Sequence, residues 1–141
     1  MIKHKNRIKQ VIDFSGVGDS KIHPTDIDAV LEFDDKYLLL FEVKYKGLKA
    51  PLGQEILFSR IADCWQSIKQ EAFVIYCEHE TKSSEIVNLY NTKVVSVYHK
   101  KIKHNQNCNL FEFLNKIANH YNITKLIKSL NYDKRISKSR H

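Results

Sequence analysis

Residues 24–44 read Pro24-Thr25-Asp26-Ile27-Asp28-Ala29-Val30-Leu31-Glu32-Phe33, then Asp34-Asp35-Lys36, then Tyr37-Leu38-Leu39-Leu40-Phe41-Glu42-Val43-Lys44. The runs 30–33 and 37–43 are rich in β-branched, aromatic and other apolar residues that favour strands. The polar Asp-Asp-Lys segment between them is turn-like. The sequence therefore predicts a β-hairpin that carries an acidic group at each end.

The acidic residues of this hairpin are spaced so that they can meet. Side chains two positions apart in a strand lie on the same face. In regular strands Asp26 and Asp28 point to one side, and Glu42 shares a face of the second strand with Lys44. Carboxylates that converge repel one another unless a cation lies between them or one of them keeps its proton. The arrangement predicts a cation site.

Magnesium is the cation that these groups suit best. It is held in proteins by one or two carboxylates, with water and substrate phosphate completing its oxygen ligands. Asp28 and Glu42 are the predicted ligands, Asp26 is a further candidate, and the backbone carbonyl of Val43 can supply another oxygen. Mn²⁺ is a possible substitute. Lys44 beside such an ion can orient or help to deprotonate an attacking water and offset charge on a phosphate.

This segment resembles the core of the PD-(D/E)XK nuclease superfamily, which includes restriction endonucleases, Holliday-junction resolvases and RecB-like nucleases. The resemblance spans residues 10–80 and rests on Pro24-x-Asp26 (or Asp28) followed by Glu42-x-Lys44 at the end of an apolar strand. It implies that Asp28 and Glu42 bind one or two divalent metal ions and that Lys44 assists hydrolysis. Asp26 competes with Asp28 for the first acidic position. The implied activity is Mg²⁺-dependent endonuclease or exonuclease cleavage of DNA.

A helix is predicted directly after the hairpin, with its apolar stripe at Gln54, Leu57, Phe58, Ile61, Trp65 and Ile68. Gln54 stands on this stripe, where a core-facing residue is expected. RecB-like nucleases carry a glutamine on this helix near the metal, often with an aromatic residue one turn later, and Gln54 with Phe58 is similar. Alternatively, Gln54 bonds the free backbone amides of the first helical turn. Both interpretations stand at this stage.

The charge of the chain favours a polyanionic partner. Lysine and arginine number 23 against 16 acidic residues, a net charge of +7, and such an excess promotes phosphate binding. Basic residues gather at both ends, as Lys3, Lys5, Arg7 and Lys9, and as Lys134, Arg135, Lys138 and Arg140. Nearest to the predicted site are Lys46, Lys49 and Arg60, the expected phosphate contacts. DNA is the predicted partner, RNA is not excluded, and a homodimer would suit cleavage of two strands.

Two other classes of function remain open. One is a non-catalytic nucleic-acid-binding module that retains a nuclease-like core, and the other is an adaptor whose basic surface grips an acidic protein. Three widely spaced cysteines without a CxxC motif do not suggest a disulfide framework or a zinc site. No apolar run reaches the length of a membrane span and no secretory leader is evident, so we expect no membrane association and a cytoplasmic location.

The expected fold is α/β, a restriction-endonuclease-like mixed sheet with helices on both faces. A strand at 72–77 should run parallel to an earlier strand through a right-handed crossover. A short helix at 84–90, a strand at 94–98 and two extra C-terminal helices within 110–130, with a break near Asn122, should follow. We expect residues 1–130 to form one domain and residues 131–141 to be a basic, flexible tail.

Overall fold

In the computed structural model the described residues are 13, 15–18 and 24–139, with side chains described as far as Tyr132. The basic residues expected to matter at the two ends of the chain, Lys3 to Lys9 and Lys134 to Arg140, have side chains outside this set. The structure therefore leaves their predicted role untested.

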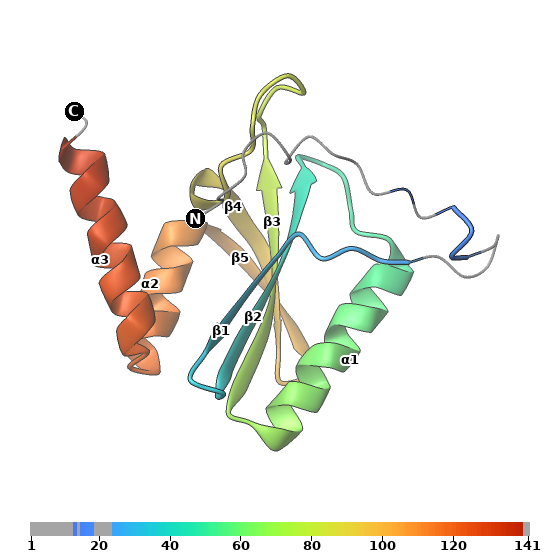
Figure 1. Ribbon diagram of the computed structural model, residues 1–141, viewed down its shortest axis with the longest axis horizontal. Helices are drawn as coiled ribbons and strands as arrows, with labels where there is room; N and C mark the ends of the chain where they lie inside the picture. The colour runs from blue at the N-terminus through green and yellow to red at the C-terminus, as the bar shows by residue number, and fades with distance from the viewer. Residues whose placement is uncertain (1–12, 14, 19–23, 140–141) are drawn as a thin grey trace.

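A five-stranded mixed sheet forms the centre of the molecule, and its spatial order follows the chain (Figure 1). The strands are β1 (Ala29–Phe33), β2 (Tyr37–Tyr45), β3 (Glu71–His79), β4 (Lys93–His99) and β5 (Ile102–Asn109). β2 and β3 pair in parallel, and the other three pairs are antiparallel. The predicted α/β class is confirmed.

The predicted hairpin is confirmed as β1 and β2. Asp34 and Asp35 both adopt a positive φ of 58° in the turn, a conformation that aspartate tolerates better than most residues. β1, however, begins only at Ala29, opposite Phe41. Asp26 and Asp28 therefore precede the strand and do not lie within it, which corrects the expectation of two carboxylates on one face of a regular strand.

Helix α1 (Leu52–Ile68) connects β2 to β3 and covers one face of the sheet, as expected. Its buried residues Phe58 and Ala62 pack against apolar side chains of β2 and β3, such as Leu40. Full burial of a large apolar side chain stabilises the fold by about 1.5–3 kcal/mol. The predicted stripe is too wide, because Leu57 and Ile68 are exposed at its edges.

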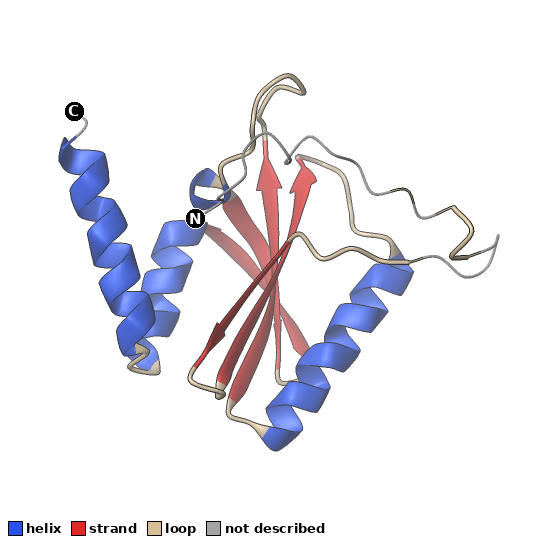
Figure 2. Ribbon diagram, in the orientation of Figure 1, coloured by secondary structure: helices blue, strands red, loops and turns tan. Residues whose placement is uncertain are grey.

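Helices α2 (Leu110–His120) and α3 (Thr124–Ser139) pack on the opposite face, so the sheet is covered on both sides (Figure 2). Asn109 caps α2 by accepting a 2.8 Å hydrogen bond from the Glu112 amide. Asn122 lies between the two helices and adopts a positive φ of 55°, which interrupts the helical conformation. Both helices and the break were predicted, but α3 continues to Ser139, beyond the expected end at residue 130.

The second half of the fold differs from the sequence prediction in one wrong element and one missed element. The helix expected at 84–90 is replaced by irregular chain and a single 3₁₀ turn, η2 (Leu89–Asn91). β5 was not predicted, because its sequence is almost wholly polar. As an edge strand it exposes most of its side chains, and only the main-chain groups on one of its sides pair with β4. Over the described residues, no helix is both long enough and apolar enough to span a membrane.

Candidate active site

The predicted site lies at the carboxyl end of β2, where the segment before β1 and the first turn of α1 approach it. Alternation along β2 sends Leu38 and Leu40 into the core beneath α1. The next side chains on that face are Glu42 and Lys44. Side chains on this face of β2 therefore change from apolar in the core to charged at the end of the strand.

Glu42 is the centre of the cluster. Its side chain is only 1% exposed, and each carboxylate oxygen has a donor. Lys44 Nζ lies 2.8 Å from Oε1, and Gln54 Nε2 donates to Oε2 at 3.1 Å. A carboxylate in this setting is held in one orientation from two sides.

The side chain of Asp28 binds the main chain of β2. Because β1 begins opposite Phe41, the amide of Val43 lies beyond the pairing of the two strands. Asp28 Oδ2 accepts this N–H at 2.7 Å. The carboxylate of Asp28 thereby replaces a ladder partner and is fixed one residue from Glu42.

Asp26 meets the cluster in a different way. Its backbone carbonyl lies 3.4 Å from Gln54 Nε2, and its side chain is exposed. The charge of Asp26 still contributes to raising the pKa of Lys44. The structure thus brings both aspartates near the site, with the carboxylate of Asp28 fixed to β2 and that of Asp26 open to solvent.

The electrostatics show how crowded the site is with negative charge. Burial raises the pKa of Glu42 above its usual value, the hydrogen bond from Lys44 opposes this, and the charge of Asp28 adds to the rise. The hydrogen bond to Glu42, together with the charges of Asp28 and Asp26, raises the pKa of Lys44. Lys44 supplies positive charge directly beside these acids.

The position of Gln54 favours a role beside the acidic cluster over a role in capping the first turn of α1. It is buried, no side-chain bond caps α1, and its amide nitrogen points to Glu42 rather than to the backbone of the first turn. Its other atom, Oε1, is buried without a hydrogen-bond partner among the described residues. An unpaired buried oxygen costs about 1–3 kcal/mol, so a group that binds this oxygen would stabilise the arrangement.

The donor set fits a magnesium ion. Two carboxylates on Asp28 and Glu42 and the carbonyl of Val43 are oxygen ligands of the kind that Mg²⁺ takes, with water and phosphate supplying the rest. The described residues contain no cluster of three or more His, Cys, Asp or Glu arranged as a metal cage. A site that relies on two carboxylates, a main-chain oxygen and substrate does not require such a cage.

Comparison of the chain with protein-family models, curated proteins and solved structures found no match. The chemistry of the cluster is therefore inferred from its own geometry. Its four side chains come from three segments: the approach to β1, the end of β2 and the first turn of α1. Asp28, Glu42, Lys44 and Gln54 were predicted from sequence to act together, and the structure brings them together.

A cavity of about 490 Å³ extends from Glu42 and Lys44 across β3 and β4 to β5, alongside α1. Lys49 and Lys103 line it, and Lys103 Nζ pairs with Glu55 at 2.9 Å and lies 4.9 Å from the centre of the Tyr76 ring. Asp28 and Val43 border a second cavity, of about 300 Å³, on the other side of β2. The Asp28–Glu42 pair thus lies between two spaces open to a ligand.

Of the three predicted phosphate contacts, only Lys49 lines the cavity next to the site. Lys49 lines the larger cavity, Lys46 instead pairs with the exposed carboxylate of Glu80 at 2.7 Å, and Arg60 is exposed on α1 and is not a lining residue. Sequence reasoning missed Lys103, because β5 was not recognised as a strand. Alternation along 102–109 would have placed it on the same face as the site.

Proposed function

We propose that the protein is a metal-dependent nuclease of the PD-(D/E)XK type that hydrolyses phosphodiester bonds in DNA, on a restriction-endonuclease-like fold. The observation that carries this proposal is the buried Glu42 carboxylate, held between Lys44 and Gln54 and beside Asp28. A buried charge is expensive in stability, and clustered carboxylates with raised pKa are typical of functional sites. An ordinary hairpin end would need none of these groups.

The proposed metal ligands are the carboxylates of Asp28 and Glu42 and the carbonyl oxygen of Val43, with Asp26 as a further candidate. A bound Mg²⁺, or Mn²⁺ in its place, would supply positive charge against the scissile phosphate and make water a better nucleophile.

The protein's own side chains have distinct roles in this proposal. Lys44 carries an ammonium group at the edge of the site, where it can donate to a phosphate oxygen and offset the charge that develops during hydrolysis. Gln54 is a positioning residue, because it acts through Glu42 by fixing the orientation of the carboxylate. Asp28 is oriented by the main-chain amide of Val43, so its placement does not depend on another side chain.

DNA is the proposed substrate because the cavity that begins at Glu42 is lined by lysines from two different segments. Lys49 comes from the segment before α1 and Lys103 from β5, and both line the space that begins at Glu42. A strand lying along this space would place its phosphates near both lysines while its scissile bond faces the acids. The net charge of +7 supports attraction to a polyanion.

The test is cleavage of labelled linear duplex, single-stranded and four-way-junction DNA in Mg²⁺, in Mn²⁺ and in chelator. The native chain should cut at least one substrate only with metal, and Glu42→Ala should not. Glu85→Ala, which removes an exposed glutamate far along the chain from the site, is the matched control and should cut normally. Binding of DNA without cleavage under every condition would refute the nuclease and favour the non-catalytic module.

A further inference from the structure

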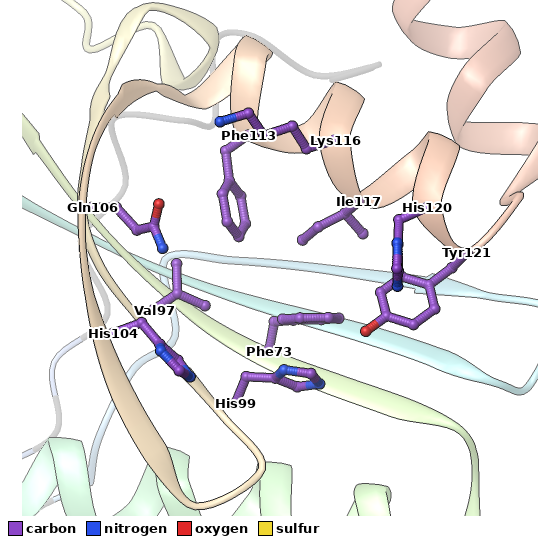
Figure 3. A pocket seen from close by; sticks show the side chains of 10 residues that line it. All are labelled: Phe73, Val97, His99, His104, Gln106, Phe113, Lys116, Ile117, His120 and Tyr121. Atoms are coloured by element: carbon purple, nitrogen blue, oxygen red, sulfur yellow. The ribbon is translucent and has the colours of Figure 1, made fainter.

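A third cavity, of about 500 Å³, lies between α2 and the sheet, on the face opposite α1 (Figure 3). Its floor comes from β3 and β4 through Phe73, Val97 and His99, and its upper wall from α2 through Phe113. Glu42 and Lys44 line neither its floor nor its walls. This volume is within the range of small-molecule sites, and the proposed nuclease chemistry does not use it.

Flat rings form much of its lining. The rings of Phe73 and His99 stack at 4.2 Å between centroids with 21° between their planes, and Tyr121 meets Phe73 edge-on at 5.9 Å. His99 is fixed in place, because its Nε2 lies 2.6 Å from Glu71 Oε2. Burial raises the pKa of Glu71, but hydrogen bonds from His99 and Gln66 outweigh it, so the pKa lies below its usual value. These contacts hold the aromatic rings that line the cavity in fixed positions.

The polar groups around this surface are basic or neutral. Lys116 and His120 project from α2, and His104 and Gln106 come from β5. In the part of the chain that the structure describes, no aspartate or glutamate lines the cavity. The side chains of Lys116, His104 and His120 are exposed, so they stand at the rim, where they can reach a ligand without a change in the core.

We propose that this cavity binds a mononucleotide, separately from the nuclease site. The aromatic base would lie beneath Phe113 and against the outer face of the Phe73–His99 stack, since every base offers a flat face for stacking. Gln106 presents both a donor and an acceptor, the complement of a base edge. The phosphate would be held at the rim by Lys116, whose charge no neighbouring carboxylate of the cavity neutralises.

Three features together select this class of ligand over a simple apolar molecule or a bare anion. An apolar ligand would make no use of the polar groups of Gln106 and Lys116. Inorganic phosphate would bind Lys116 at the rim but would make no contact with the aromatic rings. In a mononucleotide the base contacts the aromatic rings and Gln106, and the phosphate contacts Lys116.

The experiment is a ¹H–¹⁵N NMR titration of the full chain with adenosine 5′-monophosphate, adenosine and inorganic phosphate. The monophosphate should produce saturable shifts at amides of Phe73, His99, Gln106 and Phe113. Adenosine should shift the same amides with weaker affinity, and phosphate alone should bind more weakly than the monophosphate. Saturable binding confined to other amides, or no saturation, would overturn the proposal.

Variants separate the parts of the site. Lys116→Met should weaken binding of the monophosphate roughly tenfold, the contribution of one charged hydrogen bond, and leave adenosine unchanged. Lys128→Met, an exposed lysine of α3 outside the cavity, is the matched control and should change neither. Lys44→Ala should also leave the titration unchanged, because the nuclease site is separate. Equal affinity in Lys116→Met and the native chain, or loss of binding in Lys44→Ala, would contradict the assignment.

Discussion

Replacing Glu42 by glutamine should stabilise the protein in metal-free solution, although the change removes an ion pair. Glutamine keeps the size of the side chain and can still accept from Gln54. What it removes is a carboxylate that is 1% exposed and that stands next to the negative charge of Asp28. A functional site built from like charges stores strain that a neutral side chain relieves.

The magnitude follows from three contributions. Desolvation of a buried carboxylate costs several kcal/mol. The ion pair with Lys44 returns only about 1 kcal/mol, because the lysine side chain is 33% exposed and remains solvated when its partner is lost. The charge assistance in the Gln54 bond adds about 1 kcal/mol. We expect a net gain of about 1–2 kcal/mol in the free energy of unfolding, or about 3–8 °C in Tm for a chain of this size.

Urea and thermal unfolding of the native chain and Glu42→Gln, each in chelator and in Mg²⁺, measure this directly. Metal at about 100 times its Kd should raise the free energy of unfolding of the native chain by about 2.7 kcal/mol and that of the variant by much less. The order of stability should therefore reverse when metal is added. Destabilisation of Glu42→Gln by more than about 1 kcal/mol in chelator would show that the carboxylate serves the fold, and would refute the reasoning.

Three further predictions concern neighbouring groups. Lys44→Ala should lose metal-dependent DNA cleavage but keep DNA binding, whereas Lys46→Ala, in the turn directly after β2 and paired with an exposed carboxylate, should cut normally; similar turnover in both would remove the lysine from the mechanism. Calorimetric titration with Mn²⁺ should show Asp28→Asn weakening metal binding about tenfold and Asp26→Asn weakening it less, because only the Asp28 carboxylate is fixed to β2; equal losses would mean that both acids bind. Glu71→Gln should lower the free energy of unfolding by about 1 kcal/mol near neutral pH and by progressively less in acid, because a group whose pKa is lowered on folding contributes stability above its unfolded pKa and loses it as pH falls through the folded pKa. Urea unfolding across this range checks the last prediction, and a difference independent of pH would contradict it.

Much of the site was predictable because short-range geometry determines it. The period of two along β2 fixes Glu42 and Lys44 on one face whatever the rest of the chain does. The polar turn between two strand-forming runs fixes the antiparallel pairing of β1 with β2. The apolar stripe of the next segment places Gln54 on the buried side of α1.

What escaped prediction depends on tertiary contacts. Only the docking of the first turn of α1 against β2 decides that Gln54 bonds Glu42 and not the helix backbone. Only the point at which β1 begins decides that Asp28 takes the Val43 amide. β5 is a strand because β4 offers it a free edge, although its own residues are polar, and Lys103 was missed with it.

The most direct test of the central claim, that Asp28 and Glu42 form a metal-binding catalytic site, is an anomalous-scattering measurement on crystals of the native chain soaked in Mn²⁺. The account predicts a manganese peak within about 2.0–2.6 Å of carboxylate oxygens of both Asp28 and Glu42, and no peak there in Glu42→Gln. Manganese bound elsewhere, with none between these two acids in the native chain, would contradict it.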